Sequence, residues 1–342
     1  MFYFSVTLIL SIIFTLLIRR FALRLQVIDK PDGGRKLHSS PRPLLGGVAI
    51  FVAFWLVIGY LTLFHPVYGI EILNRKLLGA FVASILLVIL GIADDVRQLS
   101  AKARLFATAL ITILAITVGT LAIEKVNNPW GSTLELSLMI GNVLVFFWLL
   151  GMMYTTKVLD GLDGLATGIV TIGAFIIFFF TQTTKYYQPN VGLIALVFAA
   201  ACLGFLLFNF YPARIFLGEA GSLFLGFMLA VLAVIAGSKM AIAALVMAVP
   251  IADLARVMYT RLRRRQSLFQ GDREHLHFQL LDHGWRHGWV VVFFYAVAIV
   301  LGVTTLFLQS TQKLVLLGLV LGAMVLVGFT FKSPLEGGSR GV

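Results

Sequence analysis

Long apolar runs alternate with short polar connections along the whole chain. Each run is long enough to cross a bilayer as a helix, since a span needs about 20 residues. The runs lie at roughly 2–18, 44–64, 77–93, 105–123, 140–156, 165–182, 191–211, 222–237, 241–258, 289–308 and 314–331. The pattern predicts an all-α integral membrane protein with about eleven transmembrane helices, forming one multispan domain over residues 1–342.

The composition excludes the other classes of protein. Hydrophobic residues make up 60% of the chain and charged residues 12%, whereas soluble domains are about half apolar and about a quarter charged. Disorder requires low hydrophobicity, and an outer-membrane barrel has alternating strands rather than long apolar runs. The single cysteine, Cys202, excludes an intramolecular disulfide and a cysteine metal site.

The first apolar run predicts the orientation in the membrane. It is followed by Arg19, Arg20 and Arg24 and by no small-residue cleavage site, so we interpret it as a retained helix with its N-terminus outside. An odd number of spans then makes the C-terminus cytoplasmic. The predicted cytoplasmic segments are 19–43, 94–104, 157–164, 212–221, 259–288 and the tail from 332.

This topology explains the net charge of +12, so nucleic acid binding is not needed to explain it. Of the 27 Lys and Arg residues, six fall outside: Arg75, Lys76, Lys125, Lys185, Lys239 and Lys313. Of the 15 acidic residues, only Glu71, Glu124 and Glu135 fall outside. Acidic residues gathered among basic ones on one face indicate an active site there, facing the cytoplasm.

Adjacent carboxylates, Asp94 and Asp95, end the third run. Two neighbouring carboxylates repel each other and are costly near hydrocarbon unless a cation or a proton holds them. One interpretation is a solvated helix end neutralised by Arg97. The other is a site for phosphate chemistry, which the following motifs favour.

The segment KVLDGLDGLATG carries Asp160 and Asp163, three residues apart and therefore on one face of a helical turn. Neighbouring glycines permit close approach of a phosphate. Carboxylates beside such a loop suit magnesium bound to a diphosphate. The alternative is an Asp-Gly turn that caps the next helix.

The segment IFLGEAGSLFLG places Glu219 between two glycines at the start of a helix. Such an acid is either a helix cap or a ligand, since both use the positive end of the helix. Asn209 and Phe216 precede it.

Two further cytoplasmic segments carry basic and histidine side chains. His275 and His277 stand beside Asp272, Arg273 and Glu274; their spacing does not support zinc, and we expect them to bind the diphosphate of a nucleotide. The arginines at 261 and 263–265 are interpreted as topology and lipid-headgroup contacts. In the first loop, Lys36 and His38 are predicted to contact phosphate, or else to serve topology.

Five loops in order carry DKPDGGRKLH…PRPLLGG, ADD, LDGLDGLATG, FNFYPARIFLGEAGS and P…AD…R…DREHLH, over about residues 27–288. In these motifs the chain resembles the polyprenyl-phosphate N-acetylhexosamine-1-phosphate transferase family. The nearest branch loads N-acetylglucosamine-1-phosphate onto undecaprenyl phosphate. The resemblance implies eleven spans, a magnesium ion, for which manganese could substitute, a UDP-N-acetylhexosamine and undecaprenyl phosphate in the bacterial cytoplasmic membrane.

Carried over by motif, Asp94, Asp95, Asp160 and Asp163 are implied as catalytic, and Asn209 and Phe216 as nucleotide-side residues. The resemblance places the histidine motif at His275 and His277, and the metal at Glu219 with Asp160 or Asp163. The chain departs from the family pattern at four positions: Glu219 in place of Asp, Phe278 in place of His, and Lys157 and Tyr154 where Asn is usual. These departures affect the expected sugar specificity and metal geometry.

The predicted reaction is transfer of a sugar-1-phosphate to the lipid with release of UMP, as the first membrane step of a cell-envelope glycan such as lipopolysaccharide or teichoic acid. We expect Lys157 to contact the diphosphate or to pair with Asp160. A covalent route through Asp95 stays open, as do a catalytically inactive lipid-phosphate-binding scaffold, a secondary transporter and a homodimer.

Overall fold

The computed structural model describes residues 1–31, 40–65, 74–123, 125–127, 133–237, 239–267 and 273–330. It is 79% helical. In this part of the chain, eight helices are long and apolar enough to cross a membrane, or up to nine if one bent helix pair is a single span. The predicted class, an all-α integral membrane protein, is confirmed at this level.

Each predicted apolar run contains one helix or one helix pair. The helices are α1 (Phe2–Arg24), α2 (Gly46–Phe64), α3 (Asn74–Arg97), α4 (Ala101–Gly119), α5 (Leu138–Leu159), α6 (Leu165–Thr181), α7 (Pro189–Asn209), α8 (Gly218–Ile235), α9 (Met240–Val246), α10 (Ala248–Arg263), α11 (Leu276–Asp282), α12 (His287–Phe307) and α13 (Ser310–Thr330). A short 3-10 helix lies at Thr184–Tyr186. Two antiparallel strand pairs, which the apolar pattern did not predict, are β1 (Ile28–Asp29) with β2 (Arg42–Pro43) and β3 (Lys125–Asn127) with β4 (Thr133–Glu135).

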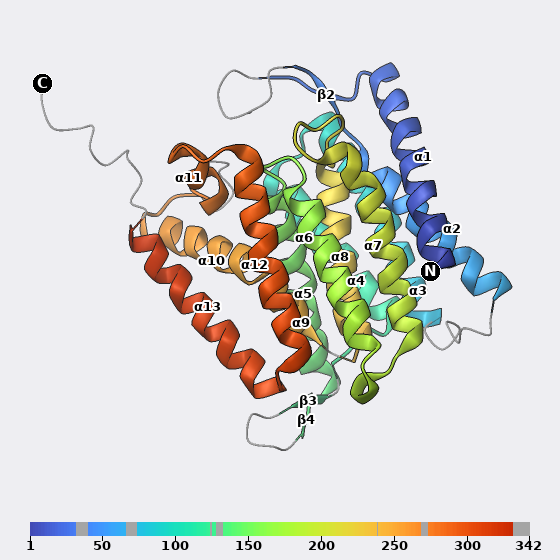
Figure 1. The fold of residues 1–342 in the computed structure, drawn as a ribbon, viewed down its shortest axis with the longest axis vertical. Helices are drawn as coiled ribbons and strands as arrows, with labels where there is room; N and C mark the ends of the chain where they lie inside the picture. Colours follow the sequence, from blue (N-terminus) through green and yellow to red (C-terminus); the bar gives the residue numbers. More distant parts are fainter. Residues whose placement is uncertain are drawn as a thin grey trace, which may run out of the picture.

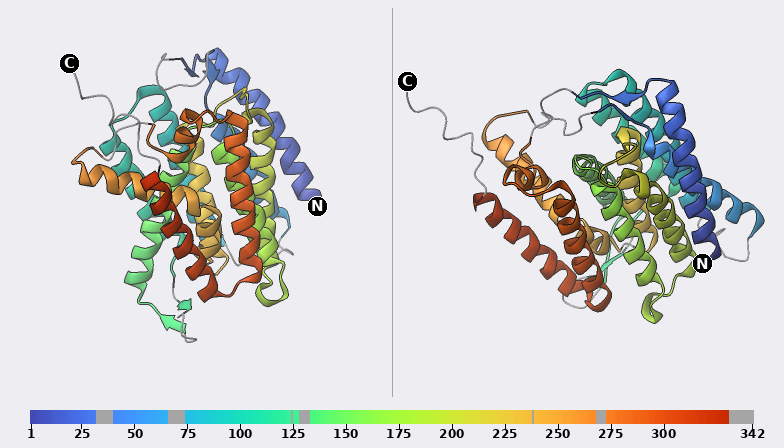
Figure 2. Two further views of the ribbon diagram at one scale, coloured as in Figure 1. Left: turned by 60° about the vertical axis from the view of Figure 1, so that its left-hand side comes forward. Right: turned by 45° about the horizontal axis from the view of Figure 1, so that its top comes forward.

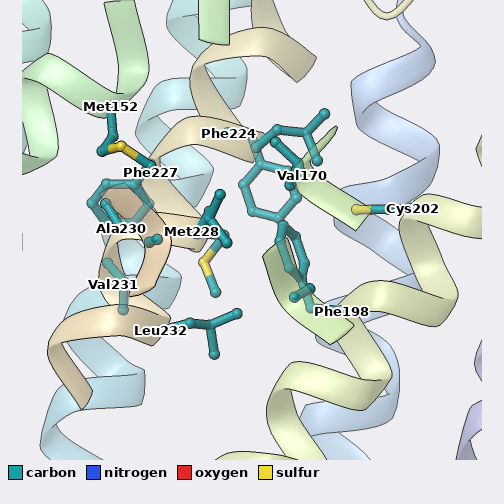
Figure 3. Close-up of a cluster of buried hydrophobic side chains, with 14 of the residues drawn as sticks. Met152, Val170, Phe198, Cys202, Phe224, Phe227, Met228, Ala230, Val231 and Leu232 are labelled. Carbon is teal, nitrogen blue, oxygen red and sulfur yellow. The ribbon is translucent and has the colours of Figure 1, made fainter. Parts of the chain in front are cut away.

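Helix α8 forms the centre of the bundle. Its sequence is apolar on every side, which is typical of a helix surrounded by other helices, and 94% of its span is buried, against 22% for α1. It packs against α2, α3, α5 and α6. Figure 3 shows Phe224, Phe227 and Met228 of α8 among side chains of the neighbouring helices.

The backbones of helices α2 and α8 are in direct contact. A Cβ on Gly47 would lie 2.0 Å from the Cα of Gly221, so only glycine fits there. The amides of Gly46 and Gly47 donate to the carbonyls of Phe216 (3.0 Å) and Leu217 (2.9 Å). These contacts fix the backbone immediately before Glu219.

The predicted single span at 241–258 is instead a broken one. Helices α9 and α10 meet at an angle of 77°, and α10 lies across the other helices in Figure 1. Pro250 is in the first turn of α10; because proline has no amide hydrogen, it cannot donate to the carbonyl of Val246 and continue α9. The bend carries the end of α10 towards α11.

The two ends of the bundle differ in character. Figures 1 and 2 show the β1–β2 pair and α11 at one end and the β3–β4 pair at the other. The amide of Phe216 donates to the carbonyl of Pro43 (2.9 Å), which ties β2 to the connection between α7 and α8. The end that carries β1, β2 and α11 therefore also carries the start of α8 and its Glu219. Helix α11 lies within the predicted cytoplasmic segment 259–288.

Candidate active site

Asp94 closes the turn between α3 and α4. Its Oδ1 accepts the amide of Leu99 at 2.7 Å, and its Oδ2 accepts Nη1 of Arg104. Ser100 caps α4 by accepting the amide of Ala103 (3.3 Å). Arg97, which we considered as the neutralising cation, is exposed, and the cation on Asp94 is Arg104 from the first turn of α4.

Asp95 lies at the N-terminus of α8. The amide of Glu219 donates to its Oδ1 at 3.0 Å, so the carboxylate uses the positive end of the central helix. Gly218 makes this approach possible: its φ is +76°, and a Cβ there would lie 2.7 Å from Asp95 Oδ2. Within the described residues, that Oδ2 atom is buried and has no hydrogen-bond partner.

Glu219 is bound by cations from two helices. Lys157 of α5 donates to both carboxylate oxygens, at 2.5 and 2.6 Å. Nη1 of Arg104, from α4, lies 3.7 Å from Oε1. Among the described residues, Lys157 thus pairs with Glu219 rather than with Asp160, and its expected contact with a diphosphate stays a prediction.

Asp160 and Asp163 occupy the turn between α5 and α6. Asp160 is the C-cap of α5. Burial raises its pKa well above the usual value, and the negative charges of Glu219, Asp95 and Asp163 raise it further, while Lys157 lowers it. Asp163 Oδ2 accepts the amide of Ala213 at 2.9 Å, which joins this turn to the α7–α8 connection.

These side chains form one group, the acid cluster: Asp94, Asp95, Asp160, Asp163 and Glu219. Direct contacts join Asp94 to Glu219 through Arg104, and Asp95 to Glu219 through the backbone. Electrostatic interaction joins Asp160 to Asp95, Asp163 and Glu219. Three motifs that are far apart in the sequence thus meet at the start of α8.

The two predicted nucleotide-side residues flank the connection between α7 and α8. Asn209 is buried, accepts from Thr167 Oγ1 (3.1 Å) and donates to the carbonyl of Ile215 (3.1 Å). Both groups of its amide are therefore used to hold the loop. Phe216 is half-buried, and its backbone bonds to Gly46 and Pro43.

A second group of charged side chains, the histidine cluster, consists of Asp253, Arg256, Glu274 and His275. Asp253 Oδ2 accepts the amide of Leu276 (3.0 Å) and bonds to Nδ1 of His275 (2.9 Å). Its Oδ1 accepts two bonds from Arg256, at 2.8 and 3.2 Å. Arg256 also donates to the carbonyl of Glu274 (2.6 Å), so the cluster anchors the start of α11 on α10.

His277 faces the turn that carries Asp160. A Cβ on Gly161 would lie 2.7 Å from Nε2 of His277 and 2.8 Å from the ring of Phe278. Burial lowers the pKa of His277 to about 3. Its Nε2 is buried and, among the described residues, has no hydrogen-bond partner.

Of the remaining predicted substrate-binding residues, the structure describes only Arg273. Arg273 donates to Asp282 at 2.6 Å and lies over the ring of Phe278, 5.5 Å from its centre. Lys36, His38 and Asp272 lie outside the part of the chain that the structure describes.

Comparison with known proteins decides the family. The family model described as glycosyl transferase family 4 matches residues 77–237. A protein of Bacillus subtilis named "Probable undecaprenyl-phosphate N-acetylglucosaminyl 1-phosphate transferase" is 30% identical over 314 residues, which are 90% of this chain and 84% of that protein. The chain belongs to the polyprenyl-phosphate N-acetylhexosamine-1-phosphate transferase family. The predicted resemblance is confirmed.

Other relatives in this family differ in the lipid that they are named for. "Decaprenyl-phosphate N-acetylglucosaminephosphotransferase" of Mycobacterium tuberculosis is 29% identical, covering 93% of this chain and 84% of the relative. "Undecaprenyl-phosphate alpha-N-acetylglucosaminyl 1-phosphate transferase" of Yersinia pestis is 27% identical, covering 94% and 88%. All three names contain N-acetylglucosamine and a polyprenyl phosphate.

Two of the four departures from the family pattern meet in one ion pair. Lys157 and Glu219 are 62 residues apart in sequence and joined by two bonds. Tyr154, one turn earlier on α5, contacts Thr108 Oγ1 at 3.2 Å. Phe278 packs on Gly161 beside His277. The lysine and the longer acid therefore contact each other directly.

The donor chemistry of the acid cluster fits magnesium in part. Carboxylate oxygens are the ligands that magnesium prefers, and the unpartnered Asp95 Oδ2 and the mutually repelling acids around Asp160 fit a divalent cation. However, the residues that the structure describes contain no group of three or more His, Cys, Asp or Glu side chains arranged to hold a metal, and Lys157 already binds Glu219.

The contacts of Arg104 and Asp253 were not predicted from the sequence. Arg104 lies ten residues after Asp94, within the predicted cytoplasmic segment 94–104. Asp253 lies in the last of the five motifs. A carboxylate inside an apolar run is costly and needs a partner, and Arg256 three residues later was the available signal.

Proposed function

We propose that this protein transfers N-acetylglucosamine-1-phosphate from UDP-N-acetylglucosamine to undecaprenyl phosphate and releases UMP. The observation that carries the proposal is the acid cluster itself, with a buried Asp95 oxygen at the N-terminus of α8 that has no hydrogen-bond partner in the described part of the chain. Family membership supports the same reaction class. The product would begin a cell-envelope glycan.

In this reaction a lipid phosphate oxygen attacks the β-phosphorus of the donor, and the bond from that phosphorus to the α–β bridging oxygen breaks. UMP leaves with the electron pair. The attacking group needs little activation, since a phosphomonoester has a second pKa of about 6 and is largely dianionic at neutral pH. Asp95 would orient the attacking phosphate through a proton or a cation held at Oδ2, which has no hydrogen-bond partner within the described residues, while Arg104 and Lys157 balance charge at the site.

Magnesium, with manganese as a substitute, belongs to the proposal as the cofactor. Asp160 and Asp163 would hold it with Glu219, and it would neutralise the diphosphate when bound. Asp160 needs such a partner most, because its pKa is raised by burial and by three neighbouring carboxylates. His277, His275 and Asn209 would line the nucleotide side, and Lys36, His38, Asp272 and Arg273 would contact phosphate.

We propose eleven spans with the N-terminus outside and the acid cluster at the cytoplasmic face of a bacterial inner membrane. Besides the eight, the spans would be α6, an apolar helix of 17 residues, α13, which is apolar over Ser310–Met324, and the bent α9–α10 pair. The excess of Lys and Arg in the segments at this end supports the orientation.

The test is UMP release from the purified protein in detergent with undecaprenyl phosphate and a panel of UDP-sugars. The proposal expects UMP to appear only when the lipid and UDP-N-acetylglucosamine are both present. Release with a different UDP-hexosamine would correct the sugar. No release with any UDP-sugar would favour the inactive lipid-phosphate scaffold. Uptake of a UDP-sugar by the protein reconstituted into vesicles, without UMP release, would favour a transporter.

A further inference from the structure

The Lys157 ammonium holds both oxygens of the Glu219 carboxylate. The two distances, 2.5 and 2.6 Å, describe a symmetric pair, and the side chains are only 19% and 27% exposed. An ammonium centred on both oxygens occupies the space in front of the carboxylate. Arg104 Nη1 also lies 3.7 Å from Oε1. A divalent cation can therefore bond these oxygens only by displacing the ammonium, because positive charges repel each other strongly at such a distance.

The other acids of the cluster are placed differently. Asp94 has its own cation in Arg104. Asp95 Oδ2, buried, has no partner within the described residues, and Asp160 lies in the combined negative field of Glu219, Asp95 and Asp163. Positive charge is therefore supplied on the Glu219 side of the cluster and is in deficit around Asp95 and Asp160.

Lys157 can exchange partners without a change of fold. It is in the last turn of α5, three residues before Asp160, and its side chain has four flexible carbons. A phosphate group arriving in the cluster would offer the ammonium an alternative anion, and Glu219 would then be free.

We propose that Lys157 keeps divalent cations off Glu219 in the substrate-free protein and releases this carboxylate only when the phosphates of the donor enter the cluster. Lys157 and a divalent cation thus alternate on the Glu219 carboxylate. The second half of the proposal rests on the proposed function, since it takes the donor to be a nucleotide diphosphate sugar. The first half, competition for Glu219, does not.

The competition is measured by manganese binding to the purified protein without any substrate, using electron paramagnetic resonance to count free manganese. We expect Lys157→Gln to bind manganese about tenfold or more tightly than the wild type. Lys157→Arg keeps a cation and should bind like the wild type. Lys102→Gln is the matched control, because it removes one exposed positive charge near the start of the neighbouring helix α4.

A crystal structure with bound manganese then distinguishes direct coordination by Glu219 from a general change in the electrostatic potential of the site. The anomalous signal should lie within bonding distance of a Glu219 oxygen in Lys157→Gln, and away from Glu219 in the wild type. Lys157→Met, which has similar length and no charge, is the second variant if Lys157→Gln fails to fold. Thermal unfolding of each variant is recorded first.

Two results would overturn the inference: unchanged or weaker manganese affinity in both uncharged variants, or manganese bound by Glu219 in the substrate-free wild type. Neither depends on turnover. A protein that binds manganese as expected but releases no UMP would refute the proposed function and leave the competition intact.

Discussion

The acid cluster and the histidine cluster are both built around buried or half-buried carboxylates at one end of the bundle, but they differ in how many hydrogen bonds and ion pairs those carboxylates make. In the histidine cluster, Asp253 uses both oxygens in four bonds to Arg256, His275 and the Leu276 amide. In the acid cluster, Asp95 keeps one buried oxygen without a partner in the described part of the chain, and Asp160 has a raised pKa.

This difference fits a structural role for the histidine cluster and the catalytic role that we propose for the acid cluster. A buried charge whose bonds are complete fixes the position of its neighbours, whereas unsatisfied buried groups cost free energy and persist where a ligand completes them. Asp253 fixes the start of α11 and so places His277 beside Gly161. The acid cluster is where substrate and cation would enter.

The largest expected effect is at Glu219. We expect Glu219→Gln and Glu219→Ala to abolish transfer, because the carboxylate is lost and the Lys157 ammonium is left without its partner. Glu219→Asp should retain measurable activity. UMP release and its magnesium dependence are the measurements. An active Glu219→Gln enzyme with a wild-type magnesium response would leave Asp160 and Asp163 as the metal ligands.

Asp95→Asn tests the unpartnered oxygen directly. The change preserves shape and an acceptor for the Glu219 amide, so we expect unchanged thermal unfolding and a loss of turnover of about a hundredfold or more. Near-normal turnover would reduce Asp95 to a helix-capping residue.

Asp253→Asn should have the opposite effect to Asp95→Asn, on thermal unfolding rather than on turnover. Removing the charge leaves Arg256 and His275 without their anion, and breaking a buried pair costs about 3 kcal/mol. We therefore expect a clear fall in the thermal unfolding midpoint. If Asp253→Asn unfolds like the wild type, the distinction between the two clusters fails.

The lowered pKa of His277 predicts that the stability of the protein depends on pH. Its pKa is about 3 in the folded protein, below the usual value near 6.5, so the unfolded chain takes up the proton first. The contribution of His277 to the free energy of unfolding is therefore complete above about pH 7. At about pH 5 the free energy of unfolding is lower by about 2 kcal/mol. His277→Gln should remove that part of the dependence; equal pH profiles for the two proteins would contradict it.

The smallest effect is expected at Lys157. Lys157→Asn should raise the apparent KM for the nucleotide sugar by several-fold, because one charge-assisted hydrogen bond is lost. The change in kcat should be smaller. Kinetics with varied donor check this. A loss of expression alone would make Lys157 structural.

Periodicity and charge predicted the helices and the end at which the acids gather, because both are local properties of the chain. Contacts across the sequence could not be predicted in the same way. The pattern did not show that Lys157 binds Glu219 rather than Asp160, or that Arg104 rather than Arg97 neutralises Asp94, since each choice depends on how α4, α5 and α8 pack. The bend at α9–α10 was also missed, although Pro250 was visible in the sequence.

The central claim is that a sugar-phosphate, not a sugar, is moved at the acid cluster. The direct test supplies UDP-N-acetylglucosamine labelled at the β-phosphorus, together with undecaprenyl phosphate, and follows the label. The account predicts that the label moves into the lipid fraction while unlabelled UMP is released in equal amount. Label that stays in the nucleotide as UDP would mean transfer of the sugar alone and would contradict the account.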